Sequence, residues 1–379
     1  MDFGHGMIGL DCGPDTVLYC EGSGRVLVLN ATAAVICRAF ARGTTVDDIY
    51  RGLAATTHAD EREVEHDVRR LDKAWRELAS RRRDAEPLTL PTAAHAVERE
   101  CVSAAPYRQR YRLADFRFEL RSSELADHRA AQSVLRHLQD SDEGAADAVL
   151  GLVRRGERRL MIHDGAVVDE CENASTVGPM VHATTLMLAY TNTRRFAALH
   201  AGAVLRNGQC ILLPAVSGNG KSTLTAALST AGYEYLTDDF AILTAPPIRV
   251  RAVPLGIGLK EGSWSVLADR FPTLTELPIH VRADGKRIRY VPMTSSEIQD
   301  EPVAVRALVF SEYRPAVDTT CRAIRPADAL VRLSTAGYDT RLCEETVRAF
   351  VAWLCAVPSY ELHYSALDGA IAAIDEVAR

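Results

Sequence analysis

Residues 211–223 combine the residue types that bind and activate a phosphate group. They read Ile-Leu-Leu-Pro-Ala-Val-Ser-Gly-Asn-Gly-Lys-Ser-Thr, an apolar run followed by a glycine-rich turn. Backbone N–H groups of such a turn and of the following helix point inward at an anion. Lys221 would reach the β- and γ-phosphates of a nucleotide, and the Ser222 hydroxyl would face Mg²⁺. The segment predicts binding of ATP and Mg²⁺ by Ser217, Gly218, Asn219, Gly220, Lys221, Ser222 and Thr223.

The elements expected around this turn are those that a phosphate-binding loop needs. The strict pattern G-x-x-x-x-G-K-[ST] begins with Gly, whereas this chain has Ala215. Asn207-Gly208 predicts a hairpin turn, which would be followed by a strand over 210–215 and a helix over 223–229. Strand, glycine turn and helix in this order favour a phosphate-binding loop over a Gly/Ser segment that merely turns the chain.

Two adjacent carboxylates follow that helix, in the run Tyr-Leu-Thr-Asp-Asp-Phe-Ala-Ile-Leu at 235–243. We expect a strand here, and because neighbours on a strand point to opposite sides, Asp238 and Asp239 would have different roles. One would hold Mg²⁺ and the other would accept the proton of an attacking hydroxyl. Asp239 is assigned to the metal together with Ser222, although the sequence leaves open which carboxylate is the base. The alternative is an Asp-Asp turn or helix cap.

Further candidate residues flank these segments. His200 precedes a strand expected at 203–205, where it would orient a carboxylate or donate to phosphate, or serve as a structural histidine. Lys260, in a Gly-punctuated segment, would stabilise charge on the transferring phosphate. A basic cluster follows, and its alternation would place two arginines on one strand face for substrate binding, or on a solvated edge strand. Its members are Lys286, Arg287 and Arg289.

Composition limits the class of protein. A chain of 379 residues is long enough for two or three domains, and a formal net charge of −6 argues against nucleic-acid binding. Nine cysteines without C-x-x-C pairs argue against a zinc site or a disulfide framework, and favour free thiols in the cytoplasm. The first 13 residues lack the basic start and apolar core of a signal peptide, and no apolar run is long enough to span a membrane.

The order of predicted elements divides the chain. Near the N-terminus, two apolar strands joined by a Gly-rich turn precede three helices, of which Asn30 would cap the first and Thr44 or Thr45 the second. Arginine and proline residues then indicate a linker. Short strands and helices follow, before the nucleotide-binding part. We expect domains at 1–85, 107–198 and 199–379, with a linker at 86–106.

Three segments together resemble the catalytic core of HPr kinase/phosphorylase. They are Leu-His-Ala-Gly at 199–202, the phosphate loop at 215–222 and Leu-Thr-Asp-Asp at 236–239, in matching order and spacing. That family is distantly akin to phosphoenolpyruvate carboxykinase and phosphorylates a serine on a protein. The resemblance covers about residues 110–379 and is closest to an HPr-kinase-related subgroup found in peptide-modification systems. It implies a P-loop α/β domain with Mg²⁺-ATP on the loop, a base and a metal ligand at the aspartate pair, and His200 beside them.

The chain departs from that family at two points. Ala215 replaces the first glycine of the loop, and the Glu-x-Arg-Gly-Leu-Gly segment of the bifunctional enzymes has no counterpart. The nearest stretch, Arg-Ala-Val-Pro-Leu-Gly at 251–256, lacks the glutamate. The resemblance therefore implies kinase rather than phosphorylase activity. It also suggests a homo-oligomer.

The N-terminal unit resembles the PqqD-like peptide chaperones, also called RiPP recognition elements. The residues that carry this resemblance are Val-Leu-Val-Leu-Asn-Ala-Thr-Ala-Ala-Val-Ile at 26–36 and Thr-Val-Asp-Asp-Ile at 45–49. It covers about residues 15–80 and implies a winged-helix module that binds a leader peptide as an added strand beside a helix. A winged helix for dimerisation or DNA is the alternative, but the unit has no basic stripe.

Together these features predict a multidomain protein of mixed α+β and α/β class. A PqqD-like winged helix would capture a leader peptide at residues 15–80, and a P-loop domain related to HPr kinase and PEP carboxykinase would phosphorylate a Ser or Thr hydroxyl of that ribosomally made peptide. Two alternatives remain. One is a kinase for free serine or a sugar, and the other is a nucleotide-gated peptide-binding protein without phosphoryl transfer.

Overall fold

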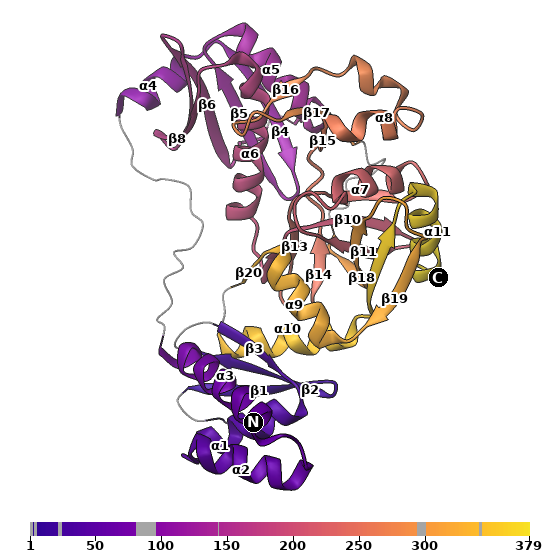
Figure 1. The fold of residues 1–379 in the computed structure, drawn as a ribbon. Coiled ribbons are helices and arrows are strands. Elements are labelled where there is room, and N and C mark those ends of the chain that lie inside the picture. Colours follow the sequence, from indigo (N-terminus) through magenta and orange to yellow (C-terminus); the bar gives the residue numbers. More distant parts are fainter. Residues whose placement is uncertain are drawn as a thin grey trace. The chain divides into compact units, whose positions relative to one another are not determined.

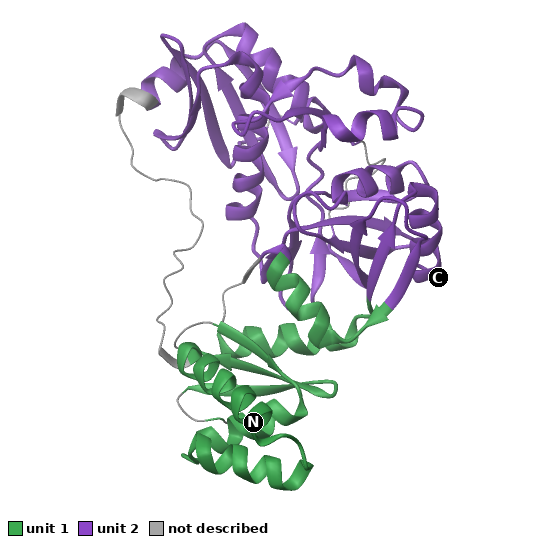
Figure 2. Cartoon of the chain, in the orientation of Figure 1, with its two compact units in different colours: residues 1–87, 323–335, 340–359 green, residues 88–322, 336–339, 360–379 purple. Residues whose placement is uncertain are grey.

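The computed structural model divides the chain into two compact units of discontinuous sequence, coloured separately in Figure 2. Unit 1 contains residues 1–87, 323–335 and 340–359, and unit 2 contains residues 88–322, 336–339 and 360–379. The structure describes residues 3, 6–21, 25–80, 96–142, 144–293, 301–340 and 343–379.

Unit 1 is built on a three-stranded antiparallel sheet in the order β1-β2-β3 (Figure 1). The predicted pair of strands and three helices near the N-terminus are confirmed, and β1 is an additional strand. The side chain of Asn30 caps α1 by accepting from the Ala33 N–H, and Thr45 caps α2 by accepting from the Asp48 N–H. The elements are β1 (Met7–Cys12), β2 (Asp15–Cys20), β3 (Arg25–Leu29), α1 (Ala31–Ala41), α2 (Val46–Thr57), α3 (Glu61–Ser80), α9 (Pro326–Ala336) and α10 (Glu344–Ala356).

Strand β2 is buried along its whole length because both faces of this sheet are covered. On one face Cys20 packs in an apolar core with α1 and α3. On the other face Asp15 accepts a hydrogen bond from Arg325 at 2.9 Å, and the Cys12 sulfur lies 3.4 Å from that of Cys355 in α10. Helices α9 and α10 therefore belong largely to this unit, whereas the sequence placed all of residues 199–379 in one domain.

Unit 2 contains a five-stranded sheet in the order β4-β5-β6-β7-β8, with helices on both faces. Leu150 and Leu152 of β6 face the core shared with α5 and α6, while Val153 packs against Val102 of α4. The second half of the expected linker at 86–106 is therefore a packed helix; residues 86–95 lie outside the described part. The elements are α4 (Ala96–Ala104), β4 (Tyr107–Leu113), β5 (Phe116–Ser122), α5 (Leu125–Leu135), η1 (Arg136–Leu138), β6 (Ala148–Arg155), β7 (Arg158–His163), β8 (Ala166–Cys171) and α6 (Ala174–Asn192).

The second sheet of unit 2 has ten strands and carries the phosphate loop. Its main order is β12-β10-β11-β18-β14-β13-β9-β20, and β21 pairs with both β18 and β19. Helices α7 and α11 pack together with residues of this sheet in one core. The elements are β9 (Ala197–Leu199), β10 (Ala201–Arg206), β11 (Gln209–Pro214), α7 (Lys221–Ser229), β12 (Glu234–Thr237), β13 (Ala241–Leu243), β14 (Arg249–Arg251), β18 (Val303–Tyr313), β19 (Thr320–Ile324), β20 (Tyr338–Thr340), β21 (Ser359–Tyr364) and α11 (Leu367–Val377).

A small antiparallel sheet in the order β15-β17-β16 completes unit 2. The chain is thus a mixed α/β protein with several sheets, as predicted at this level. Among the described residues, no helix is both long enough and apolar enough to cross a membrane. The remaining elements are β15 (Ile257–Lys260), η2 (Glu261–Ser263), α8 (Trp264–Leu267), η3 (Pro272–Glu276), β16 (His280–Val281) and β17 (Arg287–Val291).

Candidate functional site

Residues 215–220 connect β11 to α7 in the loop that the sequence singled out. Gly218 and Gly220 have φ of 102° and 83°, in the left-handed region that favours glycine. A Cβ at Gly220 would also lie 2.9 Å from the hydroxyl oxygen of Tyr364. Ala215 is buried and is not among the residues with positive φ, so a side chain fits where the strict motif has glycine.

A second glycine lets helix α7 pack closely against β10. A Cβ at Gly202 would lie 2.4 Å from the Thr225 hydroxyl oxygen of α7, so any side chain there would push the helix away. This packing explains the glycine in the Leu-His-Ala-Gly segment. The first N–H groups of α7 have no acceptor within the helix, and they form the positive end of its dipole. The loop and the helix start together therefore suit an anion.

A cavity of about 530 Å³, called the main cavity here, lies in front of this helix start. Its walls come from the phosphate loop, the bend after β12, helix α6, and the small sheet, all in unit 2. Most of the predicted site residues line it. They are His200, Ser217, Gly218, Gly220, Lys221, Ser222, Thr223, Asp238, Asp239 and Lys260. The predicted residues Asn219, Lys286, Arg287 and Arg289 do not line it.

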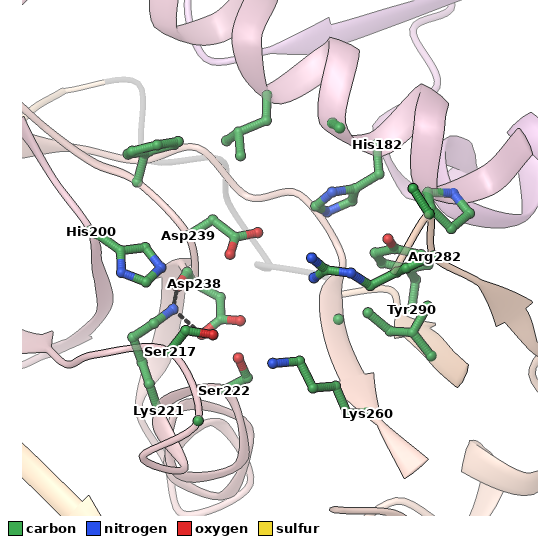
Figure 3. A pocket seen from close by; sticks show the side chains of 18 of the residues that line it. His182, His200, Ser217, Lys221, Ser222, Asp238, Asp239, Lys260, Arg282 and Tyr290 are labelled. Atoms are coloured by element: carbon green, nitrogen blue, oxygen red, sulfur yellow. Dashed lines mark hydrogen bonds and ion pairs between the residues drawn. The ribbon is translucent and has the colours of Figure 1, made fainter. Parts of the chain in front are cut away.

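Lys221 and Asp238 form a buried ion pair in the wall of the main cavity (Figure 3). The Lys221 Nζ lies 3.3 Å from Asp238 Oδ1 and also donates to the Asp238 backbone carbonyl. An ammonium group has three donors, and among the described residues Asp238 supplies both of the acceptors recorded for it. Lys221 is therefore fixed beside the loop with a donor left for a bound anion.

The aspartate pair lies in a bend and not on a strand. Strand β12 ends at Thr237 and β13 begins at Ala241, so the prediction of one strand through both carboxylates was wrong. The turn alternative is correct, and it has a consequence for the chemistry. Side chains in a bend need not alternate, and both Asp238 and Asp239 line the main cavity. Strand alternation therefore does not assign different roles to the two aspartates, and both side chains can take part in the same site.

The backbone at the C-terminal end of α9 holds His200 in one orientation. The His200 N–H donates to the Gly337 carbonyl at 2.9 Å, and its Nδ1 lies 3.2 Å from the Ala336 carbonyl oxygen. Because a carbonyl oxygen accepts, we assign the proton to Nδ1, which leaves the lone pair on Nε2. Burial, and then the charge of Lys221, lower the pKa of His200. At neutral pH the ring is therefore uncharged.

The charges around Asp239 favour its ionised form. Burial alone would raise the pKa of this carboxyl group, but Lys221, His182, His200 and Arg282 outweigh burial and hold the pKa below its usual value. Figure 3 shows the carboxylate directed toward the side of the cavity that carries His182 and Arg282. Asp239 is thus an anion that can accept a proton or bind a cation.

Among the residues of the main cavity that the sequence did not single out are His182, Arg282 and Tyr290. His182 of α6 donates from Nε2 to the Gly256 carbonyl at 3.1 Å and stacks on Tyr290, with ring centroids 4.5 Å apart. Arg282 follows β16 and lies in the cavity wall (Figure 3). His182 precedes Asp239 by many residues in sequence, so spacing gives no signal for it. Arg282 shortly precedes the predicted basic cluster in sequence, so the prediction reached the correct segment of the chain but not the residue that lines the cavity.

That basic cluster faces the other way. On β17, Ile288 and Tyr290 line the main cavity, so the alternating Arg287 and Arg289 lie on the opposite face. Both guanidinium groups lie over the Trp264 ring, at 5.5 and 4.4 Å from its centroid. They therefore pack against Trp264 and not in the wall of the main cavity, and their assignment to substrate binding stays a prediction.

The oxygen donors of the main cavity fit a magnesium ion that a nucleotide helps to hold. Ser222, Asp238 and Asp239 offer a hydroxyl and two carboxylates. The described residues contain no group of three or more His, Cys, Asp or Glu that could hold a metal by itself. Mg²⁺ commonly uses one or two carboxylates together with waters and substrate phosphates. The donor set and the glycine cradle therefore suit Mg²⁺ with a nucleotide.

Residues 15–78 match the family model of Coenzyme PQQ synthesis protein D (PqqD). The match spans β2 to α3, so unit 1 contains a PqqD-like domain, a RiPP recognition element. PqqD domains bind the leaders of precursor peptides, which connects this chain with peptide recognition in RiPP biosynthesis. No curated protein matches the chain significantly.

Proposed function

We propose that the protein is an ATP-dependent kinase for a Ser or Thr hydroxyl of a ribosomally made precursor peptide. The observation that carries this proposal is the meeting of Lys221, Asp238 and Asp239 in one cavity beside a glycine loop, in a chain that also has a PqqD-like domain. A cavity alone would suit many nucleotide-binding proteins. The peptide-binding domain supports a peptide as the acceptor.

In this proposal, some residues of the main cavity bind the phosphates and the metal, and Asp239 acts on the acceptor hydroxyl. Bound Mg²⁺-ATP supplies the phosphoryl group and neutralises part of its charge. The N–H groups at the start of α7 and the Lys221 ammonium group bind the phosphates. Asp238, held by Lys221 beside the loop, holds the metal together with Ser222. Asp239, on the side of His182, accepts the proton of the hydroxyl. This reverses the sequence-based assignment of Asp239 to the metal.

Leader capture would take place at the free edge of the unit 1 sheet. Strand β3 is the last strand in the order β1-β2-β3, and its residues Val26 to Val28 are half-buried. A leader added to this edge would gain main-chain hydrogen bonds, with side chains of α3 nearby to give selectivity. Holding the leader raises the local concentration of the attached acceptor. The affinity for peptide would thus come from one unit and the chemistry from the other.

Mass spectrometry on a candidate precursor peptide, sought among the genes that neighbour the one encoding this chain, tests the proposal. The full chain with Mg²⁺ and ATP should add the mass of one phosphate to the peptide. Asp239→Asn should keep nucleotide and peptide binding but lower kcat by about 10²-fold or more, because the proton acceptor is lost. An unmodified peptide, with both ligands shown to bind, would contradict the kinase proposal and favour a nucleotide-gated binding protein.

A further inference from the structure

A second cavity adjoins the main cavity and has no role in the proposal above. This side cavity has a volume of about 430 Å³ and lies between the end of β8, the first turn of α6 and the segment from β16 to β17. Its wall and that of the main cavity have Glu170, Thr176, Arg282 and Ala283 in common. The two cavities therefore meet at these four residues.

The two ends of the main cavity differ in chemistry. At one end the phosphate loop and Lys221 suit phosphates, and Figure 3 shows the two aspartates between this end and the side that carries His182, Arg282 and Tyr290. Phosphoryl transfer is in line, so the attacking oxygen approaches opposite the leaving phosphates. The acceptor hydroxyl must then come from the end formed by α6, where the side cavity joins.

The groups at this end suit a hydroxyl on an uncharged side chain. His182 uses Nε2 to donate to the Gly256 carbonyl, so its Nδ1 carries a lone pair. Asp239 adds a carboxylate that lines the same cavity and is directed toward this side (Figure 3). Pro179 and Met180 of α6 form an apolar part of the wall. Two acceptors for one hydroxyl proton, beside apolar side chains, match a Ser or Thr residue.

The side cavity offers space that a free small molecule would leave empty. The main cavity is within the volume range of sites for single small ligands, and here it must hold nucleotide phosphates as well as the acceptor group. Strand β8 is the last strand of the five-stranded sheet, and Asp169 and Glu170 on it are exposed. An extended chain can therefore leave the junction along this edge.

We infer that the side cavity is the channel for the acceptor peptide, whose hydroxyl-bearing residue enters the main cavity between Thr176 and Arg282 while the adjoining residues lie along β8. This inference rests on the proposed kinase function. It adds that the acceptor is a residue within a polypeptide, and that Thr176, Arg282 and the edge of β8 select it.

A tryptophan at the junction tests the channel. Thr176 is half-buried in the wall of both cavities, so Thr176→Trp should fill the junction and leave the helix intact. Ser175→Trp is the matched control, because Ser175 is exposed and lines neither cavity. We expect Thr176→Trp to raise KM for the precursor peptide by about tenfold or more, with the Kd for ATP unchanged, because peptide binding alone is blocked. Ser175→Trp should resemble the wild type.

Photocrosslinking gives a readout that does not depend on turnover. A precursor peptide with benzoylphenylalanine next to the phosphorylated residue is bound to the Asp239→Asn variant and irradiated. Crosslinks within residues 169–176 or 281–285 support the channel. Crosslinks elsewhere, or equal KM for the two tryptophan variants, would overturn it and leave the kinase proposal standing. Phosphorylation of free serine but of no peptide would also overturn the channel. A wild-type protein that transfers phosphate to neither acceptor contradicts the proposed function itself.

Discussion

Two buried ion pairs of unit 2 look alike but are held differently. The side chains of Lys221 and Asp238 are 7 and 4 % exposed, and those of Arg159 and Asp127, between β7 and α5, are 10 and 3 % exposed. Arg159 donates to Asp127 at 2.7 Å and also to the carbonyls of Glu157 and Glu172. Lys221 lies 3.3 Å from its carboxylate and faces a cavity. An ion pair whose arginine also donates to protein carbonyls stabilises the fold. An ion pair with a longer distance, beside a cavity, leaves its lysine able to bind a ligand.

Removal of Lys221 should have the largest effect and should act on function. We expect Lys221→Met to lower kcat for peptide phosphorylation by about 10³-fold, because a preorganised donor to the transferring phosphate is lost. The midpoint of thermal unfolding should fall less than in a variant without Arg159, because Asp238 lines the main cavity, where water can solvate its unpaired carboxylate. Lys286→Met is the matched control, since Lys286 pairs with Asp284 outside the main cavity. Normal turnover by Lys221→Met would remove the distinction between the pairs.

Removal of Arg159 should act on stability and not on turnover. Arg159→Met leaves the Asp127 carboxylate buried without its partner, which costs about 3–5 kcal/mol in comparable cases. Urea unfolding followed by circular dichroism measures this loss, and kcat per folded molecule should stay near that of the wild type. Retained stability together with lost turnover would show that this pair, too, serves the site.

The pH dependence of the free energy of unfolding tests whether the buried histidines of unit 2 resist protonation in the folded protein. Burial lowers the pKa of His128 beside Asp127 in sequence, of His182 and His200 in the site, and of His137 to about 4. The unfolded chain then binds protons below its ordinary histidine pKa while the folded chain does not. Stability should therefore fall as the pH drops below about 6.5 and continue to fall toward the folded pKa.

His137 should account for the clearest part of this loss. Its pKa of about 4 predicts about 2 kcal/mol less stability at pH 5 than at pH 7. Urea unfolding at the two pH values should show this difference in the wild type, and His137→Gln should reduce it by that amount. An unchanged difference would mean that His137 is accessible to protons in the folded protein.

The sequence predicted the phosphate loop best, because there the residue types determine both the backbone conformation and the charge. Gly218, Gly220 and Lys221 lie close together in sequence, and their roles in a loop follow from conformation and charge alone. The aspartate bend was only the alternative prediction, because the apolar run after it resembles a strand and local propensity does not decide between the two. His182 and Arg282 reach the cavity through tertiary packing of α6 and the small sheet, which no local pattern reveals.

The fold was predicted in the same uneven way. Hairpins with a clear turn signal, such as Asn207-Gly208 between β10 and β11, are confirmed because both residues have positive φ. The attachment of helix α10 to the N-terminal sheet was not expected, because its partner strand β1 is more than 300 residues earlier in sequence.

Helix α10 also limits how the PqqD-like domain can be isolated from the rest of the chain. The family match ends at residue 78, which invites excision of an N-terminal fragment for binding studies or for fusion to another enzyme. Such a fragment would lack the helix that packs on β1 and β2, and would expose to water the face that carries Cys12 and Asp15. Engineers who wish to transplant this PqqD-like domain would have to include helix α10 and Arg325, or design another segment to cover that face.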